Sequence, residues 1–137
     1  MATATLTPST GRRAILWVDD NPKNNSYFEQ LLRERGIEVQ LALSTDDGIQ
    51  CFRSGRYGIV VSDMGREEDG QYHPDAGLDL LKKIRERDSQ VPFLFYCSAQ
   101  KAQEYREQAL HLGATDIISS PTRVMGVLLE QLGALDV

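Results

Sequence analysis

The sequence predicts one α/β domain built on a doubly wound, five-stranded parallel sheet with strand order 2-1-3-4-5 and helices on both faces. Short apolar runs alternate five times with longer segments whose apolar residues recur at helical spacing. Most of the short runs are apolar throughout, as expected for parallel strands that are covered on both faces. Strands and helices that alternate in this way, joined by right-handed crossovers, form a three-layer sandwich.

Each element can be assigned in order along the chain. The expected strands are AILWV (14–18), EVQLA (38–42), YGIVV (57–61), PFLFYC (92–97) and TDII (115–118). The first expected helix has apolar residues at helical spacing over 27–32, and the second opens at Ser44. The others are marked by apolar residues over 78–84, 102–112 and 124–132. Ser44 is placed to cap the second helix, and Asn21-Pro22 is expected to be the N-cap and N1 pair of the first.

Composition limits the classes of protein to consider. The 137 residues suit one domain, which we expect over 13–137, after a polar, Thr-rich leader over 1–12 that is expected to be disordered. The net charge of −5 disfavours nucleic acid as a direct partner. No apolar run reaches the roughly 20 residues of a membrane helix, so no membrane contact and a cytoplasmic location are expected. Cys51 and Cys97 lie in apolar surroundings and are expected to be reduced core thiols.

Three carboxylates stand at the ends of two strands that are expected to be neighbours. Asp19 and Asp20 follow the strand at 14–18, and Asp63 follows the strand at 57–61. Neighbouring strands lie about 4.8 Å apart. Two charges about 4 Å apart repel by roughly 4 kcal/mol at an effective dielectric near 20, so a hard cation such as Mg²⁺ is expected among them. The competing interpretation is that Asp20 caps a helix and Asp63 begins a turn.

Ser98 places a hydroxyl beside the same edge of the sheet, at the end of the fourth expected strand. It is expected either to donate a hydrogen bond to a phosphoryl oxygen or to cap the helix that follows. Its spacing alone leaves both interpretations open.

Four short motifs, in this order and spacing, resemble the receiver domain of bacterial response regulators, a CheY-like family with a flavodoxin-like three-layer sandwich. They are ILWVDDNP (15–22), VVSDMG (60–65), YCSA (96–99) and GATDIISSP (113–121). The resemblance covers roughly residues 13–133.

This resemblance implies a role in two-component phosphorelay signalling. Asp63 would accept a phosphoryl group from a sensor histidine kinase or a phosphotransfer protein, as a carboxylate nucleophile. Asp19, Asp20 and Asp63, with the backbone carbonyl of Gly65, would hold Mg²⁺. Ser98 would bind the phosphoryl group and pass the signal to an unknown downstream protein. Such a domain is not an enzyme beyond its own phosphoryl transfer and hydrolysis.

The sequence departs from the family pattern at three places. Ser120 stands where the family has a lysine that contacts the phosphoryl group, and Ile117 replaces the aromatic residue that takes part in switching. A hydrogen bond to a charged group contributes about 1.5–3 kcal/mol, so the switched state would be weakened about ten- to a hundredfold. The loop at 65–77 is longer than usual, and it is expected to be a lid, a docking surface or a solvated acidic loop.

Basic residues elsewhere are candidates to replace the missing lysine. Arg66, Lys101 and Arg123 are the three considered, and their order of preference stays open. His73, within the long loop, is expected to be a surface residue.

Three other functions compete with the leading one. A pseudo-receiver would keep the pocket but signal through protein contacts without phosphorylation. A Mg²⁺-dependent phosphohydrolase with an aspartyl nucleophile usually carries a second Asp two residues on, where Gly65 follows Asp63. A flavin mononucleotide protein needs a phosphate loop, whereas DDNPKNN (19–25) offers carboxylates that would repel phosphate.

Overall fold

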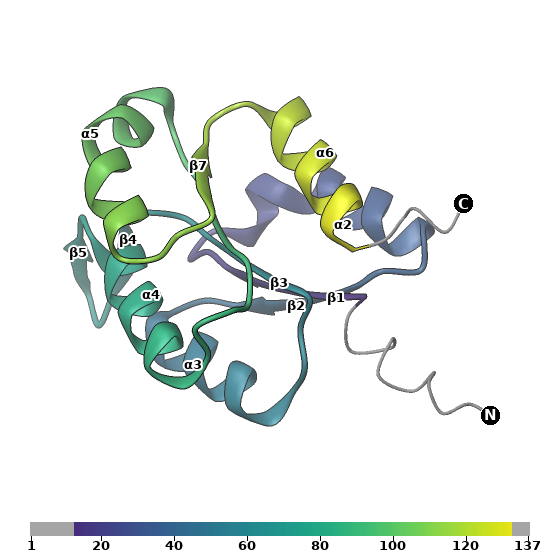
Figure 1. The fold of residues 1–137 in the computed structure, drawn as a ribbon, viewed down its shortest axis with the longest axis horizontal. Helices are drawn as coiled ribbons and strands as arrows, with labels where there is room; N and C mark the ends of the chain where they lie inside the picture. Colours follow the sequence, from purple (N-terminus) through teal and green to yellow (C-terminus); the bar gives the residue numbers. More distant parts are fainter. Residues whose placement is uncertain (1–12, 133–137) are drawn as a thin grey trace.

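Five parallel strands form the central sheet of the computed structural model, which describes residues 13–132 (Figure 1). They are β1 (Ala14–Val18), β2 (Glu38–Ala42), β3 (Ile59–Ser62), β6 (Phe93–Tyr96) and β7 (Asp116–Ile118). Their order is β2-β1-β3-β6-β7, which confirms the predicted order 2-1-3-4-5. The leader expected over 1–12 lies outside the described residues.

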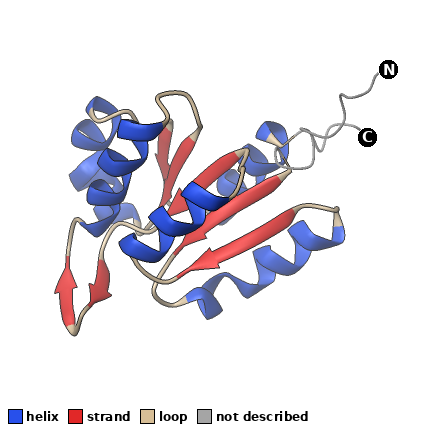
Figure 2. Ribbon diagram, turned by 90° about the horizontal axis from the view of Figure 1, so that it is seen from below, coloured by secondary structure: helices blue, strands red, loops and turns tan. Residues whose placement is uncertain are grey.

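Helices cover both faces of the sheet, so the fold has three layers (Figures 1 and 2). One face carries α3 (Thr45–Ser54), α4 (Ala76–Arg87) and α5 (Ala99–His111), and the other carries η2 (Pro22–Asn25), α2 (Ser26–Glu34) and α6 (Pro121–Gln131). Each face buries its own apolar cluster: Leu81 and Ala109 belong to the first, and Leu32 and Leu128 to the second. No helix among residues 13–132 is long and apolar enough to span a membrane.

Burial of the strands follows their place in the sheet. All five residues of β1 are buried, because the strand lies inside the sheet with helices above and below. The edge strand β2 instead exposes Glu38 and Gln40 and buries Val39 and Ala42. The continuous apolar runs in the sequence therefore mark strands that two helical layers cover.

Serine hydroxyls cap the N-termini of three helices. The Oγ atoms of Ser44, Ser98 and Ser120 accept hydrogen bonds from backbone N–H groups three residues on, at 3.1, 3.2 and 3.2 Å. The prediction that Asn21-Pro22 starts the first α-helix is wrong. Pro22 opens the 3₁₀ turn η2, without a side-chain bond from Asn21, and α2 begins only at Ser26.

The long loop contains a β-hairpin, an element that was not expected from the sequence. Strands β4 (Arg66–Glu68) and β5 (Gln71–His73) pair antiparallel and project from the main sheet (Figure 2). Asp69 and Gly70 form the two-residue turn, with φ of 56° and 77°. Positive φ at both central residues is what a tight hairpin turn requires, and Asp-Gly is a preferred pair there.

Candidate functional site

Three carboxylates converge where β1 and β3 end. The two strands are paired in parallel, with Val18 opposite Ser62, so the residues that follow them meet at one edge of the sheet. One carboxylate oxygen from each of Asp19, Asp20 and Asp63 lies within 4.8 Å of the others. They line a pocket of about 370 Å³ at the carboxyl end of the sheet, the edge where open α/β sheets bind ligands.

Neighbouring groups fix the two carboxylates from β1. Asp19 accepts hydrogen bonds from the backbone N–H of Asn21 at 2.8 Å and from the side chain of the buried Asn25 at 3.0 Å. Asp20 accepts one from the backbone N–H of Glu67 at 2.9 Å. Because Glu67 belongs to β4, the hairpin closes directly against the acidic pocket.

Asp63 is paired with Arg66, whose side chain is completely buried. One nitrogen of the guanidinium, Nη1, donates to Oδ1 of Asp63 and to Oγ of Ser62. The other two nitrogens donate to Glu68, to Thr45 Oγ1 and to the carbonyl of Ala76, at 2.8, 2.8 and 3.1 Å. These five bonds use all five N–H donors of an arginine side chain.

Burial raises the pKa of Asp63 to about 8. Loss of hydration outweighs the attraction of the Arg66 guanidinium, and the charges of Asp19 and Asp20 add to the rise. The ionised form of Asp63 is therefore costly in the pocket. A cation placed among the three carboxylates would reverse that cost.

Glu68 ties the hairpin to the start of α3. Its Oε2 accepts bonds from the backbone N–H and the hydroxyl of Thr45, at 2.7 and 2.9 Å, besides the one from Arg66. Burial acts to raise the pKa of Glu68, but these hydrogen bonds outweigh it and hold the pKa below its usual value. Arg66 and Glu68 thus join the pocket, the hairpin and α3 in one network.

The other predicted site residues fall into two groups. Gly65 and Ser98 line the pocket together with the three aspartates. Ser120 instead caps α6, and Ile117 is buried in the core on the side of α3, α4 and α5. His73, expected at the surface, is half-buried in β5, on the hairpin.

The basic residues considered as replacements for a lysine have separate positions. Arg66 lies behind Asp63, and Lys101 lines the pocket itself. Arg123 lies on the surface, where it pairs with Asp116 at 3.3 Å. Tyr72 of the hairpin accepts a hydrogen bond from the side chain of Lys101, a contact that no sequence pattern predicts.

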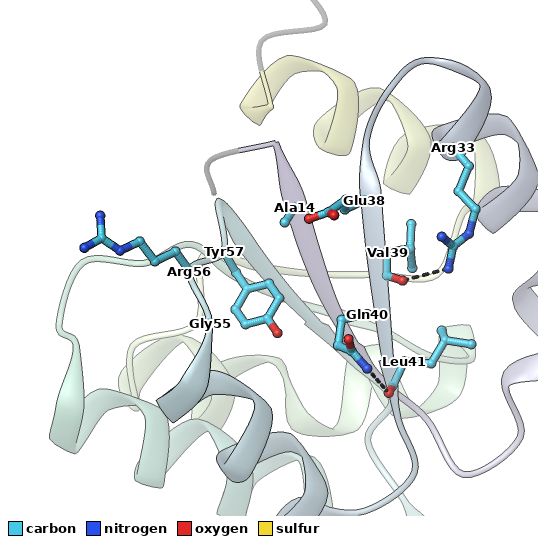
Figure 3. A pocket seen from close by; sticks show the side chains of 9 residues that line it. All are labelled: Ala14, Arg33, Glu38, Val39, Gln40, Leu41, Gly55, Arg56 and Tyr57. Atoms are coloured by element: carbon cyan, nitrogen blue, oxygen red, sulfur yellow. Dashed lines mark hydrogen bonds between the residues drawn. The ribbon is translucent and has the colours of Figure 1, made fainter. Parts of the chain in front are cut away.

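A larger hollow lies beside the edge strand β2 but lacks comparable chemistry (Figure 3). It encloses about 510 Å³, and Glu38, Arg56 and Tyr57 are among its lining residues. Arg33, on its wall, donates to the carbonyl of Val39 at 2.8 Å and so occupies part of the strand edge. No cluster of three possible metal ligands forms there among residues 13–132.

Comparison with known proteins agrees with this arrangement. The response regulator receiver domain family matches residues 15–130. The transcriptional regulatory protein DltR of Streptococcus agalactiae serotype III (strain NEM316) is 32% identical over 108 residues, 78% of this chain and 45% of that protein. CusR of Escherichia coli (strain K12) is 29% identical over the same length, 78% of this chain and 44% of that protein. The chain thus spans less than half the length of these relatives.

Solved structures share the fold. The non-phosphorylated HemR receiver domain of Leptospira biflexa superposes with a TM-score of 0.68 at 26% identity, covering 87% of this chain and 92% of that one. The response regulator TrrA of Thermotoga maritima, solved in complex with Mg²⁺ and BeF, gives 0.69 at 21% identity, over 87% and 97%. The family match spans most of the chain, and the strand order and helical layers agree with it. The chain therefore belongs to the response regulator receiver domain family.

Proposed function

We propose that this receiver domain binds Mg²⁺ in its acidic pocket and accepts a phosphoryl group on Asp63 from a sensor histidine kinase or a phosphotransfer protein. The observation that carries the proposal is the convergence of Asp19, Asp20 and Asp63 within 4.8 Å at the ends of β1 and β3. Because the curated relatives are longer than this chain, the downstream partner is proposed only as a protein.

The residues present fit a Mg²⁺ ion. Three carboxylates suit this cation, which takes a few protein oxygens and keeps several waters. Asp19, Asp20 and Asp63 would hold it, with the backbone carbonyl of Gly65 as a further ligand. The raised pKa of Asp63 supports the assignment, because burial makes its ionised form costly and a bound cation would offset that cost. When bound, Mg²⁺ would offset negative charge on the phosphoryl group in transfer.

Asp63 is arranged as a nucleophile. Arg66 holds its Oδ1, while Oδ2 has no hydrogen-bond partner among the described residues. Oδ2 is therefore the oxygen that would bond to phosphorus. The Ser98 hydroxyl oxygen accepts the N–H of Lys101, which leaves its own hydrogen free to donate to a phosphoryl oxygen.

A pseudo-receiver is the second candidate, and the Arg66–Asp63 ion pair favours it. A buried cation that already neutralises the carboxylate reduces the need for metal, and the network through Glu68 would hold the pocket in one state. In that case the domain would signal by protein contacts without phosphorylation.

Intact-mass measurement after incubation with Mg²⁺ and acetyl phosphate separates these functions. We expect one phosphoryl adduct on the wild-type protein, which does not form when EDTA chelates the Mg²⁺ beforehand and is absent in Asp63→Asn. Wild-type protein that gains no mass under forcing concentrations would overturn the proposal in favour of the pseudo-receiver. Continuous turnover of a generic phosphate ester would instead indicate a phosphohydrolase.

A further inference from the structure

Beside the proposed Mg²⁺, a cationic side chain would add to the binding of a phosphoryl group, and Ser120 does not supply one. Ser120 uses its hydroxyl to begin α6, where it accepts the N–H of Arg123. Three basic residues lie near enough in sequence or space to be considered: Arg66, Lys101 and Arg123. Their contacts differ, and the differences identify one of them.

Two of the three are already engaged with other groups. All five N–H donors of Arg66 have acceptors, and its side chain is fully buried behind Asp63 rather than within the pocket. Arg123 is exposed and pairs with Asp116, as does Arg106. Neither lines the acidic pocket.

Lys101 lines the pocket together with the three aspartates and Ser98. It stands in the first turn of α5, and its ammonium group donates a hydrogen bond to the Tyr72 hydroxyl. Within residues 13–132 it forms no ion pair with a carboxylate. An ammonium group has three N–H donors, so two stay available for a ligand.

The hairpin and Gly65 together fix where this ammonium group lies. The Nζ of Lys101 is 5.1 Å from the centre of the Tyr72 ring, which β5 of the hairpin carries. A side chain at residue 65 would fill the space: a Cβ there would be 2.0 Å from the Tyr72 hydroxyl and 2.9 Å from Nζ. The absence of a side chain at Gly65 thus lets the lysine and the tyrosine meet beside residue 65, in the pocket lining that Lys101 shares with Asp63.

We propose that Lys101, held by Tyr72 of the hairpin, binds the phosphoryl group on Asp63. Lys101 would thus make the ionic contact that the uncharged Ser120 cannot make. This inference rests on the proposed function. When acetyl phosphate is the donor, Oδ2 of Asp63 forms a bond to phosphorus. The bond between phosphorus and the acetate oxygen breaks at the same time, and acetate leaves with the electron pair. Lys101 donates hydrogen bonds to the phosphoryl oxygens and no proton is transferred.

The test is the initial rate of phosphorylation by acetyl phosphate in Mg²⁺, followed by intact mass. Lys101→Met is expected to lower the rate about ten- to a hundredfold, because one or two charge-assisted hydrogen bonds to the phosphoryl group are lost. Its Mg²⁺ affinity should stay equal or increase, because a positive charge near the three carboxylates has been removed. A merely structural role would lower both. Adding Ser120→Lys to Lys101→Met should restore part of the rate.

Matched variants separate the possible outcomes. Lys83→Met removes an exposed lysine from α4 and should keep the wild-type rate. Tyr72→Phe, which removes only the hydroxyl, should fall between the wild type and Lys101→Met. If wild type and Lys101→Met gain the adduct equally fast, the role of Lys101 is overturned and the proposed function stands. If wild type gains none, the proposed function is overturned and this inference with it.

Discussion

A single buried guanidinium joins the acidic pocket to the rest of the molecule. Arg66 pairs with Asp63 on one side and with Glu68 on the other, and it also bonds Thr45 at the start of α3. A buried ion pair is weak evidence for stability by itself, but removing one partner leaves uncompensated charge. Removal of Arg66 is therefore expected to lower stability, because the carboxylates of Asp63 and Glu68 would lose their buried counter-charge.

Arg66→Met keeps an apolar stem and removes all five donors. We expect the free energy of unfolding to fall by about 3–5 kcal/mol at pH 8, as measured by urea denaturation. At pH 5 the loss should be smaller, because protonation relieves the unpaired carboxylates. The control Lys83→Met should stay within about 0.5 kcal/mol of wild type. A loss for Arg66→Met no larger than that of the control would show that the network does not support the fold.

Mg²⁺ binding should depend on the protonation of Asp63. Its pKa is raised to about 8, so below that pH the carboxyl carries a proton that the metal must displace. The apparent affinity should rise by up to about tenfold per pH unit between pH 6 and 8 and level off above. Calorimetric titration at several pH values measures this. Asp63→Asn should bind more weakly, with a flat profile; an equally steep profile in that variant would assign the proton to another group.

At the scale of elements, the β4–β5 hairpin connects several parts of the molecule. It contacts the pocket through the backbone of Glu67, the core of the network through Arg66, and α5 through Tyr72. Its turn depends on Gly70, whose φ of 77° is unfavourable for residues with a side chain. Its geometry therefore rests on two turn residues, Asp69 and Gly70.

Gly70→Val should weaken the hairpin, because a β-branched residue in the left-handed region costs about 1–2 kcal/mol or more. Hydrogen–deuterium exchange should become about five- to thirtyfold faster in β4 and β5, while β1 and β3 keep their protection. Asp69→Asn is the matched change, since Asn tolerates positive φ, and it should exchange like the wild type. Equal exchange in both variants would mean that the turn does not hold the hairpin together.

At the scale of the whole molecule, the sequence predicts the sheet better than the contacts within the pocket. Continuous apolar runs such as 14–18 specify buried parallel strands, and helical spacing specifies the layers above and below, because both patterns arise from burial. The convergence of Asp19 and Asp63 follows from strand order alone. The roles of these residues in metal binding and phosphorylation stay predictions.

The hairpin and the buried contacts of Arg66, which the sequence did not predict, both belong to the long loop at 65–77. The Asp69-Gly70 pair is a strong hairpin signal, but the flanking runs are short and charged, so they lack the apolar alternation of a strand. A charged Arg66 in such a segment is expected in solvent, and its complete burial results from acceptors distant in sequence, such as Thr45 and Ala76. Tertiary pairing of this kind leaves no periodic trace in the sequence.

Chemical mapping of the phosphoryl group tests the central claim most directly. Borohydride reduces an aspartyl phosphate to homoserine, and peptide mass spectrometry locates the product. After treatment with acetyl phosphate and Mg²⁺, we expect homoserine at position 63 and at no other aspartate, with none formed when Mg²⁺ is withheld. Homoserine at position 19 or 20, or at no position despite Mg²⁺, would contradict the assignment of Asp63 as the phosphoacceptor.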